Sequence, residues 1–450
     1  MSQTKTYQQD FTQGPLSKQI LLFSIPLMFT NVLQILFNMA DIAVVGRFAG
    51  TIALGAVGST ATLVTLFTSL LIGIASGINV LVAHHLGAKD TKGLQETVHA
   101  AAILSATVGI FIMFIGLLFA RPILELMHTK PELIAGAVSY MHIYFLGMPA
   151  LALFNFGNAV LSAAGDTKRP LKYLSVAGII NVVLNLFFVI VCHLDVKGVA
   201  LASIISQYVS ATLILRVLLH SQEQYGLCFS KLRIHRDKLI ALARIGIPSG
   251  LQNAIFYVAN LFVQVGVNSF SATYVSANSA AANADGLVYD VMAAFYTACG
   301  SFIGQNYGAG KKKRILHSYL ISMTYAFCIG TAMGLTIWYF GEGFLSLFTK
   351  DPAVVEAGMI RLTIMSFSYG FSAFMDSAIA ASRGLGKGLV PTALVIMGSC
   401  VFRIIWIYTV FAYFGTITSL YLLYICSWTI TALAEIIYFV YVYKKELKNL

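Results

Sequence analysis

Polar side chains that could bind a cation stand at three places in otherwise apolar runs of this sequence. Asp41 interrupts the run LFNMADIAVVG, and Asn181 and Asn185 are four residues apart in GIINVVLNLFF. On a helix this spacing puts both amides on one face. Ser203 adds a hydroxyl in the next apolar run. A carboxylate, two amide oxygens and a hydroxyl can bind Na⁺, and the carboxylate can also bind a proton. We therefore predict a Na⁺ or H⁺ site here.

The structural alternatives are a buried Asp41 carboxyl satisfied by a neighbouring helix, and interhelical hydrogen bonds for the two asparagines. Depth favours a shared site. By helix rise, Asp41 lies about 30 Å from Ile20, and Asn181 and Asn185 lie about 17–22 Å from Pro170. From a cytoplasmic start, all three reach a similar outward depth. The site requires that Asp41 have no permanent basic partner and lie close to both amides.

Further ionisable residues occupy apolar segments of the second half of the chain. A charged group at the centre of a membrane helix costs about 2.5–3.5 kcal/mol on insertion scales, so each is a functional candidate. We expect Asp376 either to bind a proton or to pair with Arg361 or Arg403. Asp285 and Asp290 are expected to line the cavity. Another acid, Glu435, is expected at the membrane interface.

The composition is that of an all-α polytopic membrane protein. Of 450 residues, 58% are hydrophobic and 10% are charged, and the mean hydropathy is +0.80. Soluble domains carry about 25% charged residues. An apolar stretch of about 20 residues can cross a bilayer of about 30 Å as a helix. Twelve such segments are predicted, at 18–45, 52–83, 94–120, 132–160, 170–193, 198–220, 239–268, 274–305, 315–340, 353–381, 389–413 and 416–443.

The basic residues predict the orientation. Most of the 29 Lys and Arg residues fall on the side of the two termini, including Lys5, Lys89, Lys168, the block from Lys311 to Arg314, and Lys444. The opposite side has only Arg47, Arg121, Lys130, Lys197 and Lys350. By the positive-inside rule, both termini of this multi-pass protein are cytoplasmic. Loop topology also explains the net charge of +11 without a nucleic-acid partner.

The chain divides into two similar halves. The polar stretch HSQEQYGLCFSKLRIHRDK predicts an N-terminal lobe over 1–220, a cytoplasmic linker over 221–238 and a C-terminal lobe over 239–450. Segments of the second half match segments of the first at a nearly constant shift of 221 or 222 residues. For example, IGIPSGLQN matches FSIPLMFTN. Six spans in each half predict lobes related by a pseudo-two-fold axis along the membrane normal, an arrangement typical of secondary transporters.

The repeat does not carry the cation-binding residues into the second half. At a shift of 222, Asp41 faces Val263 and Asn181 faces Arg403. We find no P-loop, H-E-x-x-H or G-x-S-x-G motif, and the six cysteines form no C-x-x-C. We therefore expect neither an enzyme nor a resident cofactor.

In its order of motifs the chain resembles the bacterial multidrug and toxic compound extrusion (MATE) family. The resemblance rests on PLMFTNVLQILFNMADIAVVGRFAG, AHHLGAKD, LSAAGDTKRP, GIINVVLNLFF, GIPSGLQN, GQNYGAGKKKR and FMDSAIAASRGLG. It implies a secondary antiporter of the bacterial inner (plasma) membrane that exports organic cations or other amphipathic small molecules in exchange for Na⁺ or H⁺, by alternating access in the lipid bilayer. We also expect a monomer.

The resemblance also implies roles for particular residues. Asp41 matches a functional aspartate of the first span, Asn181 and Asn185 match polar residues of the fifth, and Ser203 matches a hydroxyl of the sixth. One branch uses an acid in span seven and an aspartate in span ten. Asp376 matches that aspartate, but span seven here has no acid, and some relatives carry an acid where Asn185 stands.

A lipid-linked oligosaccharide flippase is the alternative function, since such proteins can share this architecture. A flippase needs a strongly cationic cavity for a pyrophosphate headgroup. Of the Lys and Arg residues, only Arg361 and Arg403 are predicted to lie deep in the membrane and away from the cytoplasmic ends of the spans, which favours the drug antiporter.

Overall fold

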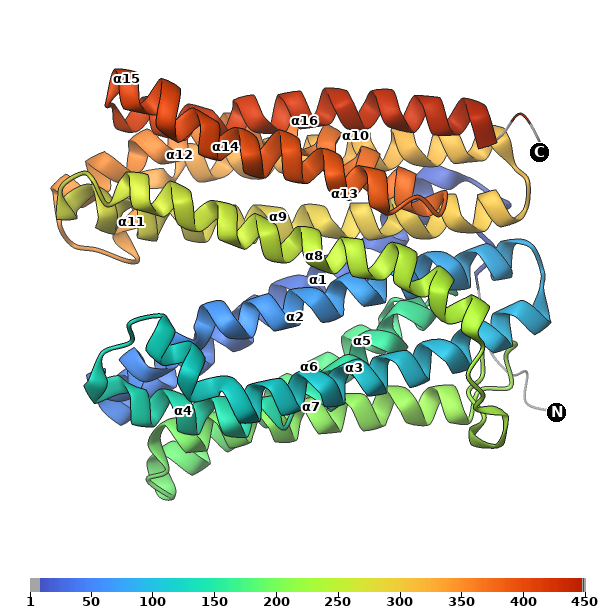
Figure 1. Cartoon of the computed structure of the whole chain (residues 1–450), viewed down its shortest axis with the longest axis horizontal. Coiled ribbons are helices and arrows are strands. Elements are labelled where there is room, and N and C mark those ends of the chain that lie inside the picture. Colours follow the sequence, from blue (N-terminus) through green and yellow to red (C-terminus); the bar gives the residue numbers. More distant parts are fainter. Residues whose placement is uncertain (1–8, 447, 449–450) are drawn as a thin grey trace. The chain divides into compact units, whose positions relative to one another are not determined.

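The computed structural model describes residues 9–446 and 448. Lys5 and the outermost residues of both termini, on which the topology prediction draws, lie outside the described residues. The described part is built of helices and contains no strand (Figure 1). The all-α prediction is confirmed.

Helices of the first half follow the six predicted spans. They are α1 (Leu16–Val44), η1 (Val45–Ala49), α2 (Gly50–Gly87), α3 (Thr91–Leu126), α4 (Pro131–Phe145), α5 (Met148–Ala163), α6 (Lys168–Leu186), η2 (Phe187–Val191) and α7 (Asp195–Leu219). The fourth predicted span is two helices, because α4 and α5 are bent by 45° at a short break. The η1 and η2 segments are π-helical turns.

Helices of the second half follow the other six. They are the short turn η3 (Phe229–Lys231), α8 (Arg236–Val267), α9 (Ala272–Gly308), α10 (Lys312–Tyr339), α11 (Gly341–Ser346), α12 (Pro352–Gly384), α13 (Leu389–Val395), η4 (Ile396–Val401), α14 (Phe402–Trp406), η5 (Ile407–Phe411), α15 (Ala412–Phe414) and α16 (Ile417–Glu446). The eleventh predicted span is thus a helix whose turns alternate between α and π.

Length and composition identify most of these helices as membrane spans. Among the described residues nine segments are long and apolar enough to cross a membrane, or ten if the bent α4–α5 pair is counted as one span. The first of them, Leu16–Gly87, contains both α1 and α2. The π-helical turn η1 lies between these helices. Gly50, the first residue of α2, has a φ of +88°, a backbone conformation that favours glycine. Helix α12 is not among the nine, and its polar Ser366, Ser368 and Asp376 lower its apolar character.

The helices group into two compact units, each with its own core. Of the described residues, the first unit takes 9–10 and Phe29–Gly250, and the second takes Phe11–Met28 and the residues from Leu251 onward. Both α1 and α8 are therefore divided between the units. The division points, after Met28 and after Gly250, are related by the same shift as the sequence repeat. The predicted lobe limits at 220 and 239 concern the membrane spans and remain a prediction.

Small residues allow close helix packing within each unit, as is common in membrane bundles. In the first unit a side chain at Gly116 of α3 would overlap the ring of Phe145. In the second, α9, α10, α12 and α16 run side by side (Figure 1). A side chain at Gly334 of α10 would overlap the carbonyl oxygen of Ser366 on α12.

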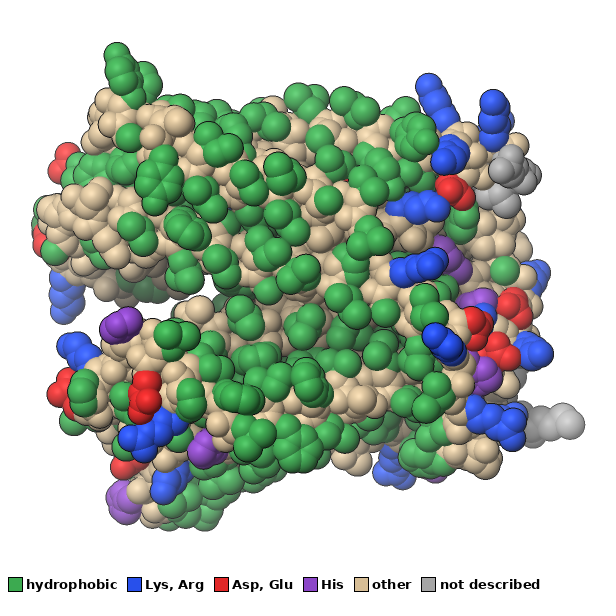
Figure 2. Space-filling model, in the orientation of Figure 1, with side chains coloured by type: hydrophobic (Ala, Val, Ile, Leu, Met, Phe, Trp, Pro, Cys, Tyr) green, Lys and Arg blue, Asp and Glu red, His purple; other side chains and the backbone are tan. Residues whose placement is uncertain are grey.

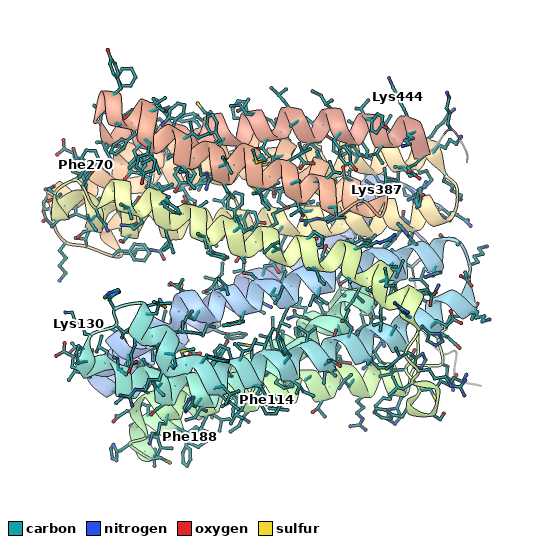
Figure 3. All side chains as sticks on the ribbon, in the orientation of Figure 1. Phe114, Lys130, Phe188, Phe270, Lys387 and Lys444 are labelled. Atoms are coloured by element: carbon teal, nitrogen blue, oxygen red, sulfur yellow. The ribbon has the colours of Figure 1, made fainter. Side chains whose placement is uncertain are left out.

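The loops predicted to be cytoplasmic gather at one end of each unit. In the second unit the Lys387 ammonium lies 2.9 Å from Glu446, and Tyr443 donates to the carbonyl of Lys312 at 3.3 Å. Lys387 and Lys444 lie at one end of this unit and Phe270 at the other (Figure 3). In the first unit Arg169 donates to Tyr225 at 3.2 Å, and Lys238 approaches Glu96 at 4.0 Å.

The flanks of the helices are apolar. Figure 2 shows hydrophobic side chains along them and most Lys and Arg side chains near the helix ends. Large apolar side chains such as Phe111, Leu118 and Ile437 are more than 60% exposed. A soluble monomer rarely exposes apolar patches of this kind. The exposed flanks are those expected of a multi-pass membrane protein, whose lipid-facing surface is apolar.

Candidate cation-binding site

The predicted cation-binding residues meet in the first unit because α1 packs closely on α6. A side chain at Gly178 would overlap the ring of Phe37, so the bare glycine leaves room for that ring. Asp41 is one helical turn beyond Phe37, while Asn181 and Asn185 are about one and two turns beyond Gly178. The Phe37–Gly178 contact therefore places Asp41 beside both amides.

Four hydrogen bonds join the Asp41 carboxylate, the two amides and the hydroxyl. The Asn185 amide nitrogen donates to Asp41 Oδ1, and the Ser203 hydroxyl donates to Asp41 Oδ2 at 3.1 Å. The Asn185 amide nitrogen also donates to Asn181 Oδ1 at 3.3 Å, and Asn181 donates to Ser203 Oγ at 3.5 Å. These four residues are hereafter called the Asp41 site.

The Asp41 site is buried and lacks a basic residue. Asn181, Asn185 and Ser203 are at most 5% exposed, and Asp41 is partly exposed. In the described part of the chain no Lys, Arg or His lies within 4.0 Å of the Asp41 carboxylate. Asn185 Oδ1 is buried and has no hydrogen-bond partner there either. A buried acceptor without a donor is costly, and a bound cation would satisfy it.

Two π-helical turns follow the Asp41 site along the chain. Segment η1 begins four residues after Asp41, η2 begins two residues after Asn185, and the two segments contact each other. Single π-helical turns are rare and occur frequently at functional sites, where they widen the helix locally. No pattern in the sequence indicated them.

Two tyrosines that the sequence analysis did not select belong beside the Asp41 site. Tyr140 and Tyr144 lie on α4 with stacked rings, 5.5 Å between centroids, and both are within electrostatic range of Asp41. Tyr140 is buried. Their spacing of four residues shares a helix face, but with 22 tyrosines in the chain this signal could not select them.

In the second unit Asp285 has a permanent basic partner. The Arg361 guanidinium forms an ion pair with Asp285 and also donates to the amide oxygen of Asn278. The Tyr369 hydroxyl donates to the other Asp285 oxygen at 2.6 Å. The alternative in which Asp376 pairs with Arg361 is therefore wrong, because Asp285 already occupies that guanidinium.

Asp376 and Asp290 belong to a separate acidic region of the second unit. Both lie within electrostatic range of Tyr289, as does Arg383. Arg383 donates to the side-chain oxygen of Gln252 at 2.9 Å. Arg383 is the basic group that acts electrostatically on Asp376. The described residues contain no ion pair between Asp376 and Arg403.

Glu435, which we expect at the membrane interface, is enclosed by the protein, and its depth in the membrane stays a prediction. It is completely buried on α16, and in the described part of the chain neither carboxylate oxygen has a hydrogen-bond partner. Its position near the chain end suggested an interface, but α16 continues for eleven residues beyond it to Glu446, and α16 packs on α12.

Arg403 lies on α14, with its guanidinium donating to Asn260 at 2.8 Å and to Ser427 at 3.4 Å. Its side chain is completely buried, and in the described part of the chain no carboxylate lies within 4.0 Å of it. Arg403 and the Asp41 site therefore lie in different units and make different contacts.

The donor set suits a proton or a hard monovalent cation better than a transition metal. The described residues contain no group of three or more His, Cys, Asp or Glu side chains that could hold a metal ion. The Asp41 site offers one carboxylate, two amides and a hydroxyl, all of them oxygen ligands. Because one acid is the only ionisable group among these four, one positive charge would neutralise it.

Comparisons with known proteins identify the family. The MatE family model matches residues 26–187 and again 248–409. The second match begins where the shift found in the sequence places the counterpart of the first, which confirms the internal repeat. Similar proteins include the probable multidrug resistance protein YpnP of Bacillus subtilis (strain 168), 30% identical over 363 residues, covering 80% of this chain and 81% of the relative.

More distant relatives and solved structures agree. The FAD transporter of Shewanella oneidensis is 25% identical, covering 79% of this chain and 80% of its own. The multidrug export protein MepA of Staphylococcus aureus (strain NCTC 8325 / PS 47) is 21% identical, covering 91% of both chains. The fold matches an outward-facing MATE family transporter of the MOP superfamily with a TM-score of 0.91, 23% identity and 98% coverage of both chains. A MOP superfamily transporter from Pyrococcus furiosus matches with a TM-score of 0.92, 22% identity and 99% coverage of both chains. The chain therefore belongs to the MatE family, that is, to the multidrug and toxic compound extrusion transporters.

Proposed function

We propose that this transporter exports cationic or amphipathic organic compounds in exchange for Na⁺ or H⁺, with the coupling ion bound at the Asp41 site. The protein would act as a monomer with both termini in the cytoplasm. Relatives named for multidrug resistance and multidrug export support the drug-export part of this proposal. The coupling part rests on the site itself.

The observation that carries the proposal is the set of partners around Asp41. Its carboxylate is held by neutral donors from Asn185 and Ser203. A carboxylate in a membrane interior is costly when it is charged. Without a fixed basic partner in the described residues, its charge can be cancelled only by something that comes and goes. A coupling ion has that property.

The Asn185 amide supplies a means of responding to the ion. Its nitrogen now faces Asp41, and its oxygen has no donor in the described part of the chain. Rotation of the amide by half a turn would bring that oxygen toward Asp41. The oxygen could then accept a hydrogen bond from a protonated Asp41 or coordinate Na⁺ shared with the carboxylate.

Ion binding can drive export only if the ion binds two conformations with different affinity. We propose that the inward-facing form takes up the drug with Asp41 free of the ion. After the lobes move to the outward-facing form, ion binding at Asp41 favours release of the drug and return. Reorganisation of the Asn185 and Ser203 hydrogen bonds would make the ion affinity depend on conformation.

The test uses purified protein in proteoliposomes with a fluorescent cationic dye, under separately imposed Na⁺ and proton gradients. We expect one gradient to drive dye transport in the wild type. In the variant Asp41→Asn, which keeps size and shape but cannot ionise, we expect gradient-driven transport to fall at least about tenfold, as for loss of a charged-group interaction.

The matched control is Asp351→Asn, which removes an exposed carboxylate that caps α12. Because asparagine caps helices about as well as aspartate, this control should transport at the wild-type rate. Ion-driven transport that persists in Asp41→Asn would refute the assignment of the coupling site. A wild type that moves no dye under either gradient would refute drug export itself.

A further inference from the structure

In our proposal Asn181 of the first unit helps to bind a cation. The equivalent position of the second unit is itself a positively charged arginine. Arg403 is the counterpart of Asn181 at the shift that relates the two matched halves. It lies about 21 Å along the helical segment that starts at Leu389, which has 26 residues. Arg403 is therefore near the middle of a membrane span, where a permanent positive charge needs a partner.

Neutral groups hold the Arg403 guanidinium in a defined plane. The rings of Phe256 and Tyr424 each lie 4.7 Å from its central carbon. One terminal nitrogen, Nη1, donates to Asn260 at 2.8 Å, and Nε donates to Ser427 at 3.4 Å. The other terminal nitrogen, Nη2, is buried and has no hydrogen-bond partner among the described residues. One edge of a rigid fork is thus left for an incoming acceptor.

The charges around Arg403 do not balance. Arg361 lies over the same Tyr424 ring, at 5.4 Å, so two guanidiniums share one aromatic neighbour. Asp285 is the carboxylate paired in this cluster, and it is bound by Arg361 and Tyr369. Among the described residues the cluster of Arg403, Arg361 and Asp285 therefore carries two fixed positive charges and one negative charge, and the excess lies at Arg403.

Some side chains that contact the two guanidiniums are partly exposed. The side chain of Asp285 is 28% exposed, and Asn260 and Phe256 are partly exposed. Asp285, Phe256 and Asn260 flank the two guanidiniums, which are themselves buried. A small acceptor group could reach Arg403 past these side chains, whereas bulk water does not contact it in this conformation.

We propose that Arg403 is a recognition site for a carboxylate or phosphate group carried by an amphipathic substrate. The guanidinium fork matches oxyanions in geometry, and a charge-assisted bond from Nη2 would satisfy the unpaired donor. The two flanking rings exclude water and orient the fork. The proposal rests on the proposed export function and adds zwitterionic or anionic compounds to its substrates.

The test compares two dyes that differ only at the recognised group. One is a rhodamine with a free carboxylate, and the other is the methyl ester of the same dye. Binding to purified full-length protein in detergent is measured by fluorescence anisotropy in the wild type, in Arg403→Gln and in Arg403→Lys. The control is Arg216→Gln, the same substitution at an exposed arginine.

We expect the wild type to bind the free acid at least about tenfold more tightly than the ester, the effect of one charge-assisted hydrogen bond. Arg403→Gln should abolish this preference, with little change in affinity for the ester. Arg403→Lys should keep part of it, because the charge stays and the planar fork is lost. Arg216→Gln should behave as wild type.

Two results would overturn the proposal. One is a wild type that binds both dyes equally, a measurement that does not depend on any variant folding. The other is an equal loss of both dyes in Arg403→Gln or Arg403→Lys, which would give Arg403 a structural role only. Titration of the wild type with sodium phosphate separates the sources of the anion. If phosphate displaces the acid dye and leaves the ester dye bound, free inorganic anions use the same oxyanion site.

The outcome is independent of ion coupling. Binding is measured without a gradient, and the Asp41 site belongs to the first unit while Arg403 belongs to the second. A preference for the acid dye that persists in Asp41→Asn would support the Arg403 site even if gradient-driven export failed. Gradient-driven export without any preference between the dyes would refute the Arg403 site alone.

Discussion

The buried and partly buried acids of this transporter differ in what neutralises them. Asp285 is paired with Arg361, and Asp166 is paired with Arg169. Asp41 accepts hydrogen bonds only from neutral groups among the described residues. An acid with a fixed counter-charge has little reason to exchange a cation. Asp41 therefore differs from these two acids in having no fixed counter-charge within the described part of the chain, as our proposal of a mobile coupling ion requires.

Replacing Asn185 by aspartate tests the oxygen set directly. In Asn185→Asp a second carboxylate would stand within hydrogen-bond reach of Asp41. Two carboxylates so close cannot both stay ionised without a shared cation or proton. We predict that the concentration of coupling ion giving half-maximal transport falls several-fold, as measured in proteoliposomes. Asn185→Leu, which offers no oxygen, should raise it. An unchanged ion dependence in both variants would exclude Asn185 as a ligand.

The residues around Asp41 show what single-residue cues can and cannot predict. Asp41, Asn181, Asn185 and Ser203 were identifiable because an acid in an apolar run is costly and amides four apart share a helix face. The structure brings them together, and whether they bind the coupling ion stays a prediction. Asp285 and Arg361 could not be paired from the sequence, because 76 residues separate them and only tertiary packing brings them together.

At the scale of helices, the contact of α1 with α6 decides the geometry of the Asp41 site. In Gly178→Val the new side chain would overlap the ring of Phe37 and move Asp41 away from the amides. We predict a loss of ion-driven transport of about tenfold, because a misplacement of about 1 Å can cost this much or more. The readout is dye transport in proteoliposomes.

The matched control is Gly58→Val, since a side chain at Gly58 meets nothing within 4 Å. Both variants make the same change in helix propensity, a small gain, because valine is a better helix former than glycine. Equal transport in the two variants would show that the Phe37–Gly178 contact does not position Asp41.

The start of α3 gives a pH-dependent contribution to stability. The Asp90 side chain caps α3, accepting from the Gly93 N–H at 2.9 Å, and this hydrogen bond lowers the pKa of Asp90. A lowered carboxylate pKa stabilises the fold above the unfolded-state pKa, about 3.9. The contribution is then lost as the pH falls through the folded-state value.

We predict that Asp90→Ala lowers stability near neutral pH by about 0.5–1 kcal/mol, the lower part of the range for a lost cap, because Asp90 is exposed. Asp90→Asn should keep the cap and lose its pH dependence. Thermal unfolding in detergent, followed from about pH 3 to about pH 7 so that the titration of Asp is included, measures the stability of both variants and its pH dependence. An acid-induced loss of equal size in wild type and Asp90→Asn would assign that loss to other groups.

Helix number and order followed from hydropathy, and local helix geometry did not. Twelve apolar segments were visible because each must be long enough to cross a bilayer. The bend between α4 and α5 and the π-helical turns η1 and η2 were not predicted, since they depend on packing that no periodicity of apolar residues encodes.

On the scale of the whole molecule, the repeat governs how the chain is organised. Two matches to one family model, at residues 26–187 and 248–409, explain why six spans follow six spans. The same shift separates the points at which α1 and α8 pass from one compact unit to the other. The repeat was predictable from short aligned segments. The sharing of α1 and α8 was not, because it depends on tertiary contacts.

The orientation of the chain can be tested with its own cysteines. Cys192 is exposed in the turn between η2 and α7, on the side predicted to face outward. Cys228 lies in the predicted cytoplasmic linker, and a hydrogen bond with Ser230 lowers the pKa of its thiol. More of that thiol is therefore in the reactive thiolate form.

We predict that a membrane-impermeant maleimide labels a variant retaining only Cys192 in intact cells. It should label a variant retaining only Cys228 only after the cells are permeabilised. Labelling that shows the opposite pattern would place both termini outside the cell. Equal labelling of both variants after permeabilisation serves as the control for thiol access.

The most direct test of ion coupling is to observe the Asp41 carboxyl while the ion binds. Infrared difference spectra of the purified transporter, recorded on adding Na⁺ or on changing the pH, report the carboxyl stretching bands. We predict a band change that is present in the wild type, absent in Asp41→Asn and reversed by an exported substrate. Identical difference spectra from the wild type and Asp41→Asn would contradict the assignment of the coupling ion to Asp41.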